Sequence, residues 1–138
     1  MSESDTPVCL VSQWKLKAGL DEKLLAVLQN LAGKVEAAEP DTLMYRVHLP
    51  TAFPLGEHGQ PSNPPAIPLA DQKAVIFVEV YRNAAAFATH TQGDVFKDFL
   101  SSTLHYFEPD PDRPGWPVTE TPFMELVSGF VRSSIKSA

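Results

Sequence analysis

The amino-acid sequence predicts an α+β fold in which the elements follow the order β-α-β-β-α-β. Segments whose apolar residues recur at every second position, as in strands, alternate with segments whose apolar residues recur every 3.6 positions, as in helices. The chain has 138 residues, of which 43% are hydrophobic, so it has the size and composition of one globular domain. Its 13 prolines gather mainly in two stretches, 50–68 and 109–122, where regular elements are not expected.

The first strand is expected at 8–17, because apolar and polar side chains alternate there. A helix is expected from about Leu20 to the residues before Pro40, because large apolar residues recur at the helical period. These residues are Leu20, Leu24, Leu28, Leu31 and Val35. Asp21 and Glu22 favour the N-terminus of this helix, where negative charge is stabilising.

The second and third strands are expected at 42–49 and 74–81. The third strand is apolar at both parities, with Val75 and Phe77 on one face and Ile76, Val78 and Val80 on the other. This pattern predicts that the strand is buried on both faces. Between these strands lies a long Pro-rich insertion, 50–73, which is too long for a tight hairpin.

The second helical region begins after Asn83, a good N-cap, and spans 84–91. Gly93 interrupts it, and a second piece with an apolar stripe continues to Phe107. A Pro-rich loop is expected at 108–121. The last strand is expected at 123–131, where Gly129 indicates a bulge or a close backbone approach.

This element order predicts a ferredoxin-like sandwich, with both helical regions on one face of a four-stranded antiparallel sheet. The other face then lacks a cover, although the third strand is apolar on that side as well. We expect a homodimer through this sheet face. The 50–73 segment is expected to lie over its own subunit or over the partner, and residues 1–7 are expected to form a flexible tail.

The charge pattern excludes several classes of partner. The 17 acidic residues outnumber the 11 basic ones, giving a net charge of -6, so neither nucleic acid nor a membrane is expected as a partner. Cys9, the single cysteine, cannot form an internal disulfide. The acidic N-terminus does not resemble a signal peptide, and we expect a cytoplasmic protein. No spacing typical of a metal, phosphate, flavin or nicotinamide site is present.

Three motifs together resemble the antibiotic biosynthesis monooxygenase (ABM) family: Trp14–Gly19, Glu39–Tyr45, and Val78–Tyr81 followed by Ala86–His90. The resemblance extends from about Val8 to Phe107 and includes the closing strand. It implies dimers of ferredoxin-like subunits whose sheets pack into an α/β barrel. Characterised members of the family insert oxygen into quinols, anthrones or haem, often without a metal or flavin, and other members have no known activity.

The same resemblance argues against haem degradation. When the chain is aligned with haem-degrading members, their asparagine falls at Ser12, their tryptophan at His90 and their haem-ligating histidine at Leu100. Because all three positions differ, we expect no haem, and no other cofactor or metal is expected either.

His90 is the main catalytic candidate, because the histidine side chain ordinarily titrates near neutral pH and can take a proton from a quinol. Alanine at this position should then lower turnover and leave melting nearly unchanged. The alternative is a structural histidine at a helix end. Tyr45 and Tyr81 are further catalytic candidates as hydroxyl donors. Trp14 and Phe87 are candidate stacking walls for a substrate ring, although core packing is the commoner role of such residues.

Glu79 stands inside an apolar strand, where a carboxylate must be paired or protonated. We expect either an ion pair with Arg46 or a contact with the substrate. His58 and His105 are expected in solvent, whereas the sequence leaves the place of His48 open. The resemblance to the ABM family therefore implies a cofactor-independent monooxygenase that acts on an electron-rich aromatic and O2. The alternative is a non-catalytic, ligand-binding or stress-associated dimer of the same fold.

Overall fold

A computed structural model describes residues 5–132 of the chain, so part of the expected 1–7 tail lies outside the described residues. Its main elements are β1 (Val8–Lys15), α1 (Glu22–Ala38), β2 (Thr42–His48), β3 (Ala74–Tyr81), α2 (Ala84–Gln92), α3 (Asp94–Thr103), β4 (Thr119–Glu120) and β5 (Phe123–Met124). Short 3-10 helices lie at Leu69–Asp71 and Leu104–Tyr106. The α+β class is confirmed, as is the predicted order of elements.

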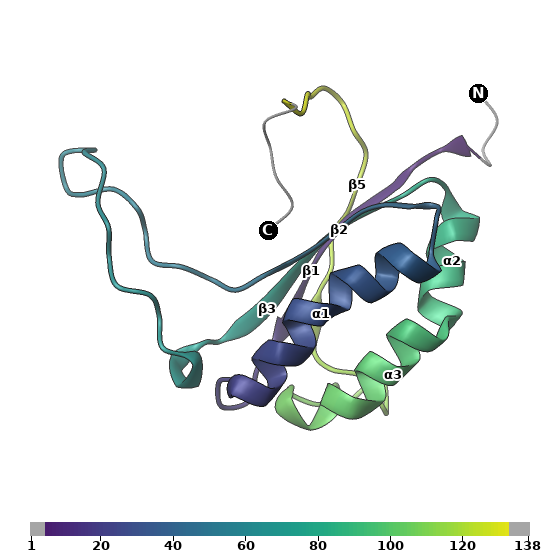
Figure 1. Cartoon of the computed structure of the whole chain (residues 1–138), viewed down its shortest axis with the longest axis horizontal. Helices are drawn as coiled ribbons and strands as arrows, with labels where there is room; N and C mark the ends of the chain where they lie inside the picture. Colours follow the sequence, from purple (N-terminus) through teal and green to yellow (C-terminus); the bar gives the residue numbers. More distant parts are fainter. Residues whose placement is uncertain (1–4, 133–138) are drawn as a thin grey trace.

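The strands form one antiparallel sheet in the order β2-β3-β1-β4, and β5 also pairs with β1. β1 and β3 pair over their whole length, from Val8 opposite Tyr81 to Lys15 opposite Ala74. All three α-helices lie on the same face of this sheet (Figure 1). This is the ferredoxin-like arrangement that the sequence predicts.

The core lies between the sheet and the helices, and Trp14 is at its centre. Side chains alternate along the strands, so every second residue of β1 and β3 points toward the helices. The Trp14 ring packs against the rings of Phe77, Phe96, Phe99 and Phe107, with centroid separations of 5.1 to 6.3 Å. α1 contributes its predicted apolar stripe, in which Leu24, Leu28, Leu31 and Val35 are buried.

The opposite face of the sheet has no helix over it within residues 5–132 (Figure 1). Ile76, Val78 and Val80 of β3 point to this face and are only half-buried. Their register partners on β1 include Val11 and Cys9. This sheet face is therefore apolar and incompletely covered by the chain itself, as the pattern of β3 predicts.

The predicted last strand is wrong beyond Met124. The chain pairs with β1 first through β4 and then through β5, with Pro122 between them, and Met124 lies opposite Cys9. Pairing ends there because β1 begins at Val8 and is preceded by Pro7, which has no backbone N–H to donate. Residues 125–132 form no strand, and several of their large apolar side chains are exposed. These are Leu126, Val127, Phe130 and Val131.

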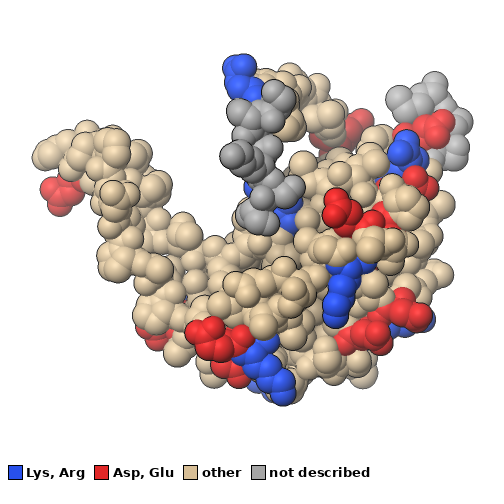
Figure 2. All heavy atoms as spheres, viewed as in Figure 1, with Lys and Arg blue, Asp and Glu red and all other residues tan. Residues whose placement is uncertain are grey.

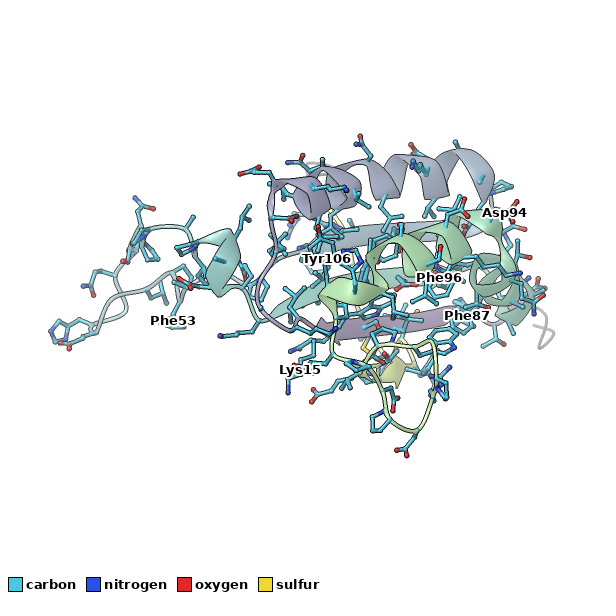
Figure 3. All side chains as sticks on the ribbon, turned by 90° about the horizontal axis from the view of Figure 1, so that it is seen from below. Lys15, Phe53, Phe87, Asp94, Phe96 and Tyr106 are labelled. Atoms are coloured by element: carbon cyan, nitrogen blue, oxygen red, sulfur yellow. The ribbon has the colours of Figure 1, made fainter. Side chains whose placement is uncertain are left out.

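The 50–73 segment forms an arm that extends away from the body of the molecule (Figure 1). Its base is held by Gln72, whose side-chain amide donates to the Pro50 carbonyl at 3.0 Å. The arm exposes 73% of Phe53, which Figure 3 shows at the opposite end of the molecule from Phe87 and Phe96. Glu57 is the only Asp, Glu, Lys or Arg between Pro50 and Pro68, and the arm is almost uncharged on the face seen in Figure 2.

The 108–121 segment, by contrast, packs against the core. Pro109 and Pro117 form an isolated antiparallel bridge, and the ring of Trp116 lies 5.7 Å from that of Phe96. None of the helices in the described part of the chain has the length and apolar character needed to cross a membrane.

Candidate functional site

The candidate site centres on His90, which is 2% exposed on the sheet-facing side of α2. Asn83 fixes the start of this helix, because its side chain accepts a hydrogen bond from the Ala86 backbone N–H. His90 Nδ1 lies 2.9 and 3.1 Å from the two carboxylate oxygens of Glu39. His90 Nε2 faces Glu79 Oε1 at 3.9 Å. The imidazole therefore lies between two carboxylates.

Glu39 reaches His90 because of the turn that ends α1. Its N–H donates to the Val35 carbonyl at 2.9 Å, and its own carbonyl accepts from the Thr42 N–H at 3.1 Å. Pro40 follows directly and cannot continue the helix. The carboxylate is 7% exposed, and Oε1 also accepts from the Thr42 hydroxyl at 2.8 Å.

Glu79 and Tyr81 lie on the same face of β3, two residues apart, and the Tyr81 hydroxyl donates to Glu79 Oε1. Burial raises the pKa of the Glu79 carboxyl above its ordinary value, against the opposing effects of Tyr81 and His90. Burial and the neighbouring Glu79 also raise the pKa of Tyr81, which therefore keeps its proton. We call Glu39, Glu79, Tyr81 and His90 the buried acid–histidine cluster.

The predicted ion pair between Glu79 and Arg46 is wrong. In the register of β2 and β3, Arg46 lies opposite Val78, whereas Glu79 lies opposite Tyr45. Successive strand residues point to opposite faces, so the Arg46 side chain points away from the face that carries Glu79. The partners of Glu79 within the described residues are Tyr81 and His90 instead.

Tyr45 lies beside the buried cluster, with its ring centroid 5.3 Å from that of His90 and 6.1 Å from that of Phe77. Burial raises its pKa well above the ordinary tyrosine value, and the charges of Glu79 and Glu39 act in the same direction. Its hydroxyl is therefore neutral, and it has no hydrogen-bond partner among residues 5–132. Such a hydroxyl can donate to a bound molecule.

A groove with a volume of about 1050 Å³ runs between α1 and β2. On the α1 side it is bordered by Leu25, Leu28, Gln29, Ala32 and Gly33, and on the β2 side by residues 42–49. Glu39 and Tyr45 line this groove and also contact His90. They connect the surface groove with the buried acid–histidine cluster.

The structure brings four of the six predicted site residues together: His90, Tyr45, Tyr81 and Glu79. The other two lie elsewhere. Trp14 is in the centre of the core, where its Nε1 donates to the Ser12 hydroxyl at 2.9 Å. Phe87 borders the buried cluster from outside: its ring is tilted against that of Tyr81, with centroids 5.2 Å apart, and it does not line the groove.

The remaining histidines lie outside the buried cluster. His58 and His105 are exposed, as predicted, and His48 is half-buried at the end of β2.

Glu39 is the site residue that the sequence analysis missed, because it lies 51 positions from His90 in the chain. A signal was present, since a carboxylate at a helix C-terminus is unfavourable unless another group compensates its charge.

The arrangement is suited to moving a proton. The Glu39 carboxylate orients the imidazole through Nδ1, as carboxylates do in acid–base dyads, and this leaves Nε2 to accept or donate. Within the described residues, no group of three His, Cys, Asp or Glu has an arrangement that could hold a metal ion. Because His90 is buried against Glu39, we now expect its removal to lower the melting temperature, in place of the unchanged melting expected from the sequence.

The raised pKa of Glu79 predicts a pH dependence of stability. The folded chain holds the Glu79 proton more tightly than the unfolded chain does, so this stabilisation is complete below pH 4.5 and is lost as pH rises through the folded-state pKa. Glu79→Gln cannot ionise, and its amide oxygen still accepts from Tyr81. We expect its melting temperature, relative to the parent chain, to rise between pH 4 and pH 9 in circular dichroism scans. An offset that is constant over this range contradicts the prediction.

Comparison with known proteins agrees with this fold. The family model described as antibiotic biosynthesis monooxygenase matches residues 7–101. No curated protein matches the chain. A solved structure of a candidate antibiotic biosynthesis monooxygenase from Caulobacter crescentus CB15 is 18% identical, with a TM-score of 0.60, and the match covers 91% of this chain and 94% of that one. Hydroxynitrile lyase from Passiflora edulis is 11% identical, with a TM-score of 0.53, and the match covers 91% and 99%. At these identities the similarity shows the fold alone.

Proposed function

Because the chain belongs to the antibiotic biosynthesis monooxygenase family, we propose that it oxidises a small, electron-rich aromatic, such as a quinol or an anthrone, with O2 and without a bound cofactor. The family supports a monooxygenase-like role in general terms. The observation that carries the finer proposal is the buried Glu39–His90 pair beside a groove that a neutral tyrosine hydroxyl borders.

This reaction requires two things of the protein: a base for the substrate proton and a hydrogen-bond donor to the substrate oxygen. The Glu39–His90 pair takes the acidic proton of the substrate, and the Tyr45 hydroxyl donates to the substrate oxygen and stabilises the anion. The anion supplies the electrons that reduce O2. For an anthrone, one oxygen atom forms the new C=O bond, and the other leaves as water with the two hydrogens of the reacting carbon. The substrate thus provides all the reducing equivalents.

Oxygen uptake tests the proposal. Purified protein is supplied with a panel of hydroquinones and anthrones in an oxygen electrode, and an enzyme-free control is subtracted at every pH, since these compounds autoxidise faster as pH rises. We expect uptake above the control with at least one substrate, and incorporation of one atom of 18O from 18O2 into its product. Uptake equal to the control across the panel contradicts an oxygenase.

One observation favours the second candidate, a non-catalytic ligand-binding protein. His90 itself does not line the groove, so a ligand in the groove would contact Glu39 and Tyr45 first. Such a protein would bind the same aromatic compounds in calorimetry with no oxygen uptake.

We also propose that the chain forms a homodimer through the open sheet face, which would create an α/β barrel from two sheets. The half-buried Ile76, Val78 and Val80 on this face support the proposal.

A further inference from the structure

The tip of the arm is held by hydrogen bonds of its own. The Ser62 N–H donates to the Pro54 carbonyl at 2.7 Å, and the Gly56 N–H donates to the Gln60 carbonyl at 2.8 Å. Gly59 adopts a φ of +80°, a conformation that glycine accepts at low cost. The arm therefore presents a defined surface away from the body of the molecule (Figure 1), and docking it costs less entropy than docking a loose loop.

Phe53 and Leu55 lie beside this tip and are 73% and 42% exposed. Aromatic side chains are typical anchors of protein interfaces, where apolar surface is removed from water. The arm carries one Asp, Glu, Lys or Arg between Pro50 and Pro68, whereas the whole chain has a net charge of -6. A second copy of this chain can therefore approach the arm without the charge repulsion that acidic surfaces would cause.

The C-terminal segment, residues 125–132, carries a second exposed apolar set. Leu126 and Phe130 are 76% and 77% exposed, and no Asp, Glu, Lys or Arg lies between 126 and 131. The sequence predicts a strand here, but within the described chain these residues pair with no strand. The segment therefore has large apolar side chains that the rest of residues 5–132 leaves uncovered.

The arm and the C-terminal segment are attached to opposite ends of the sheet. The arm leads into β3 at Ala74, which lies opposite Lys15 at the end of β1. The C-terminal segment follows Met124, which lies opposite Cys9 near the start of β1. A strand of this length separates the two ends by about 20–25 Å. Both segments rise on the side of the open sheet face (Figure 1), and Figure 2 shows a hollow between the arm and the rest of the molecule.

From this placement we infer that, in a dimer of this chain, Phe53 and Leu55 of each arm pack against the C-terminal segment of the partner subunit, at the partner's Leu126 and the partner's Phe130. In a two-fold symmetric dimer this contact is made twice. Stacked sheets lie about 10 Å apart, and residues 50–58 can span up to about 30 Å when extended. The arm is therefore long enough to reach the partner. The contact rests on the proposed homodimer through the open sheet face and is independent of the proposed reaction.

The direction of the two-fold axis decides which segments meet. An axis that runs across the strands, between the two sheets, brings the arm end of one sheet over the C-terminal end of the other. An axis along the strands places arm on arm and leaves residues 126–131 in water. The first arrangement covers both apolar sets, so it removes more apolar surface from water.

Cross-linking between single-cysteine variants tests which segments meet. Leu55→Cys and Leu126→Cys are each made with Cys9→Ser, so that every chain carries one cysteine. Each variant is treated with a short bismaleimide, alone and after co-expression with the other. We expect a covalent dimer from the co-expressed pair only. A covalent dimer of Leu55→Cys alone shows that arm meets arm, and no covalent dimer from the pair shows that the segments lie apart; either result overturns the inference.

Asn30→Cys, also with Cys9→Ser, is the control for chance collisions. Asn30 is exposed on α1, on the other face of the sheet (Figure 1). Co-expressed with Leu55→Cys, it should give no covalent dimer. If it cross-links as readily as Leu126→Cys, the reaction reports collision and the contact is not supported by it, so the inference fails.

The double variant Phe53→Ser/Leu55→Ser measures what the arm contributes to association. Both side chains are exposed within one subunit, so we expect the circular dichroism spectrum to stay as in the parent. The dimer should dissociate at a concentration at least about tenfold higher in sedimentation, as is typical when interface anchors are truncated. His58→Ser/Asn63→Ser, at exposed polar positions of the same arm, is the matched control and should dimerise like the parent. Parent-like dimerisation of Phe53→Ser/Leu55→Ser overturns the inference.

Failure of the arm contact is distinguishable from failure of the homodimer. If the parent chain sediments as a monomer, both fail. If the parent is a dimer that Val78→Asp dissociates, but the co-expressed cysteine variants give no covalent dimer, only the arm contact fails.

Discussion

The His90→Ala variant is expected to melt about 10 to 20 °C below the parent chain, because it leaves the buried Glu39 carboxylate without its main partner. Leaving a buried carboxylate without its partner typically costs about 3–5 kcal/mol in the free energy of unfolding. Turnover of an accepted quinol or anthrone should also fall by about 10²- to 10⁴-fold, the usual effect of losing a general base. Circular dichroism and the oxygen electrode measure the two effects.

The double variant Glu39→Gln/His90→Ala separates loss of the Glu39–His90 contact from simple loss of packing. It removes the carboxylate that His90→Ala leaves uncompensated, so it should melt above the single variant while remaining inactive. Turnover must be compared at a temperature where every variant is folded. If His90→Ala melts like the parent, the pair does not stabilise the fold. If its turnover falls only in proportion to the folded fraction, His90 is structural and is not the base.

The parts of the fold that the sequence predicts well are those set by neighbouring residues. α1 ends before Pro40 and α2 begins after Asn83, because the signals for both boundaries lie within a few residues of the boundary. The last strand was predicted too long for the opposite reason. Its end depends on where β1 begins, more than 100 positions earlier in the chain, and alternation within 123–131 carries no information about that limit.

In the candidate site, too, local sequence selects individual residues, whereas their contacts depend on distant parts of the chain. Composition and spacing are enough to select His90, Tyr45, Tyr81 and Glu79, because polar groups in apolar segments stand out. The pairing of Glu79 was predicted wrongly because it depends on the register of β2, which shifts between Thr42 and Met44. Glu39 was missed because its partner, His90, lies on α2 and is brought to the end of α1 only by the fold.

The Val78→Asp variant is expected to convert the proposed dimer into a monomer or to make the protein insoluble. Val78 lies on the open sheet face and is half-buried, whereas Phe77 is 1% exposed and faces the helices. A charge at Val78 therefore tests the open sheet face, whereas a charge at Phe77 would disturb the core. A charge enclosed between two sheets costs several kcal/mol, which corresponds to about a thousandfold weaker association. Sedimentation velocity measures the result.

Asn30→Asp is the control for Val78→Asp, since it adds the same charge on the exposed side of α1. It should sediment as a dimer like the parent, because α1 lies on the other face of the sheet (Figure 1). A parent chain that sediments as a stable, soluble monomer contradicts the dimer. In that case Ile76, Val78 and Val80 remain partly in contact with water, and Val78→Asp should not change the sedimentation of the chain.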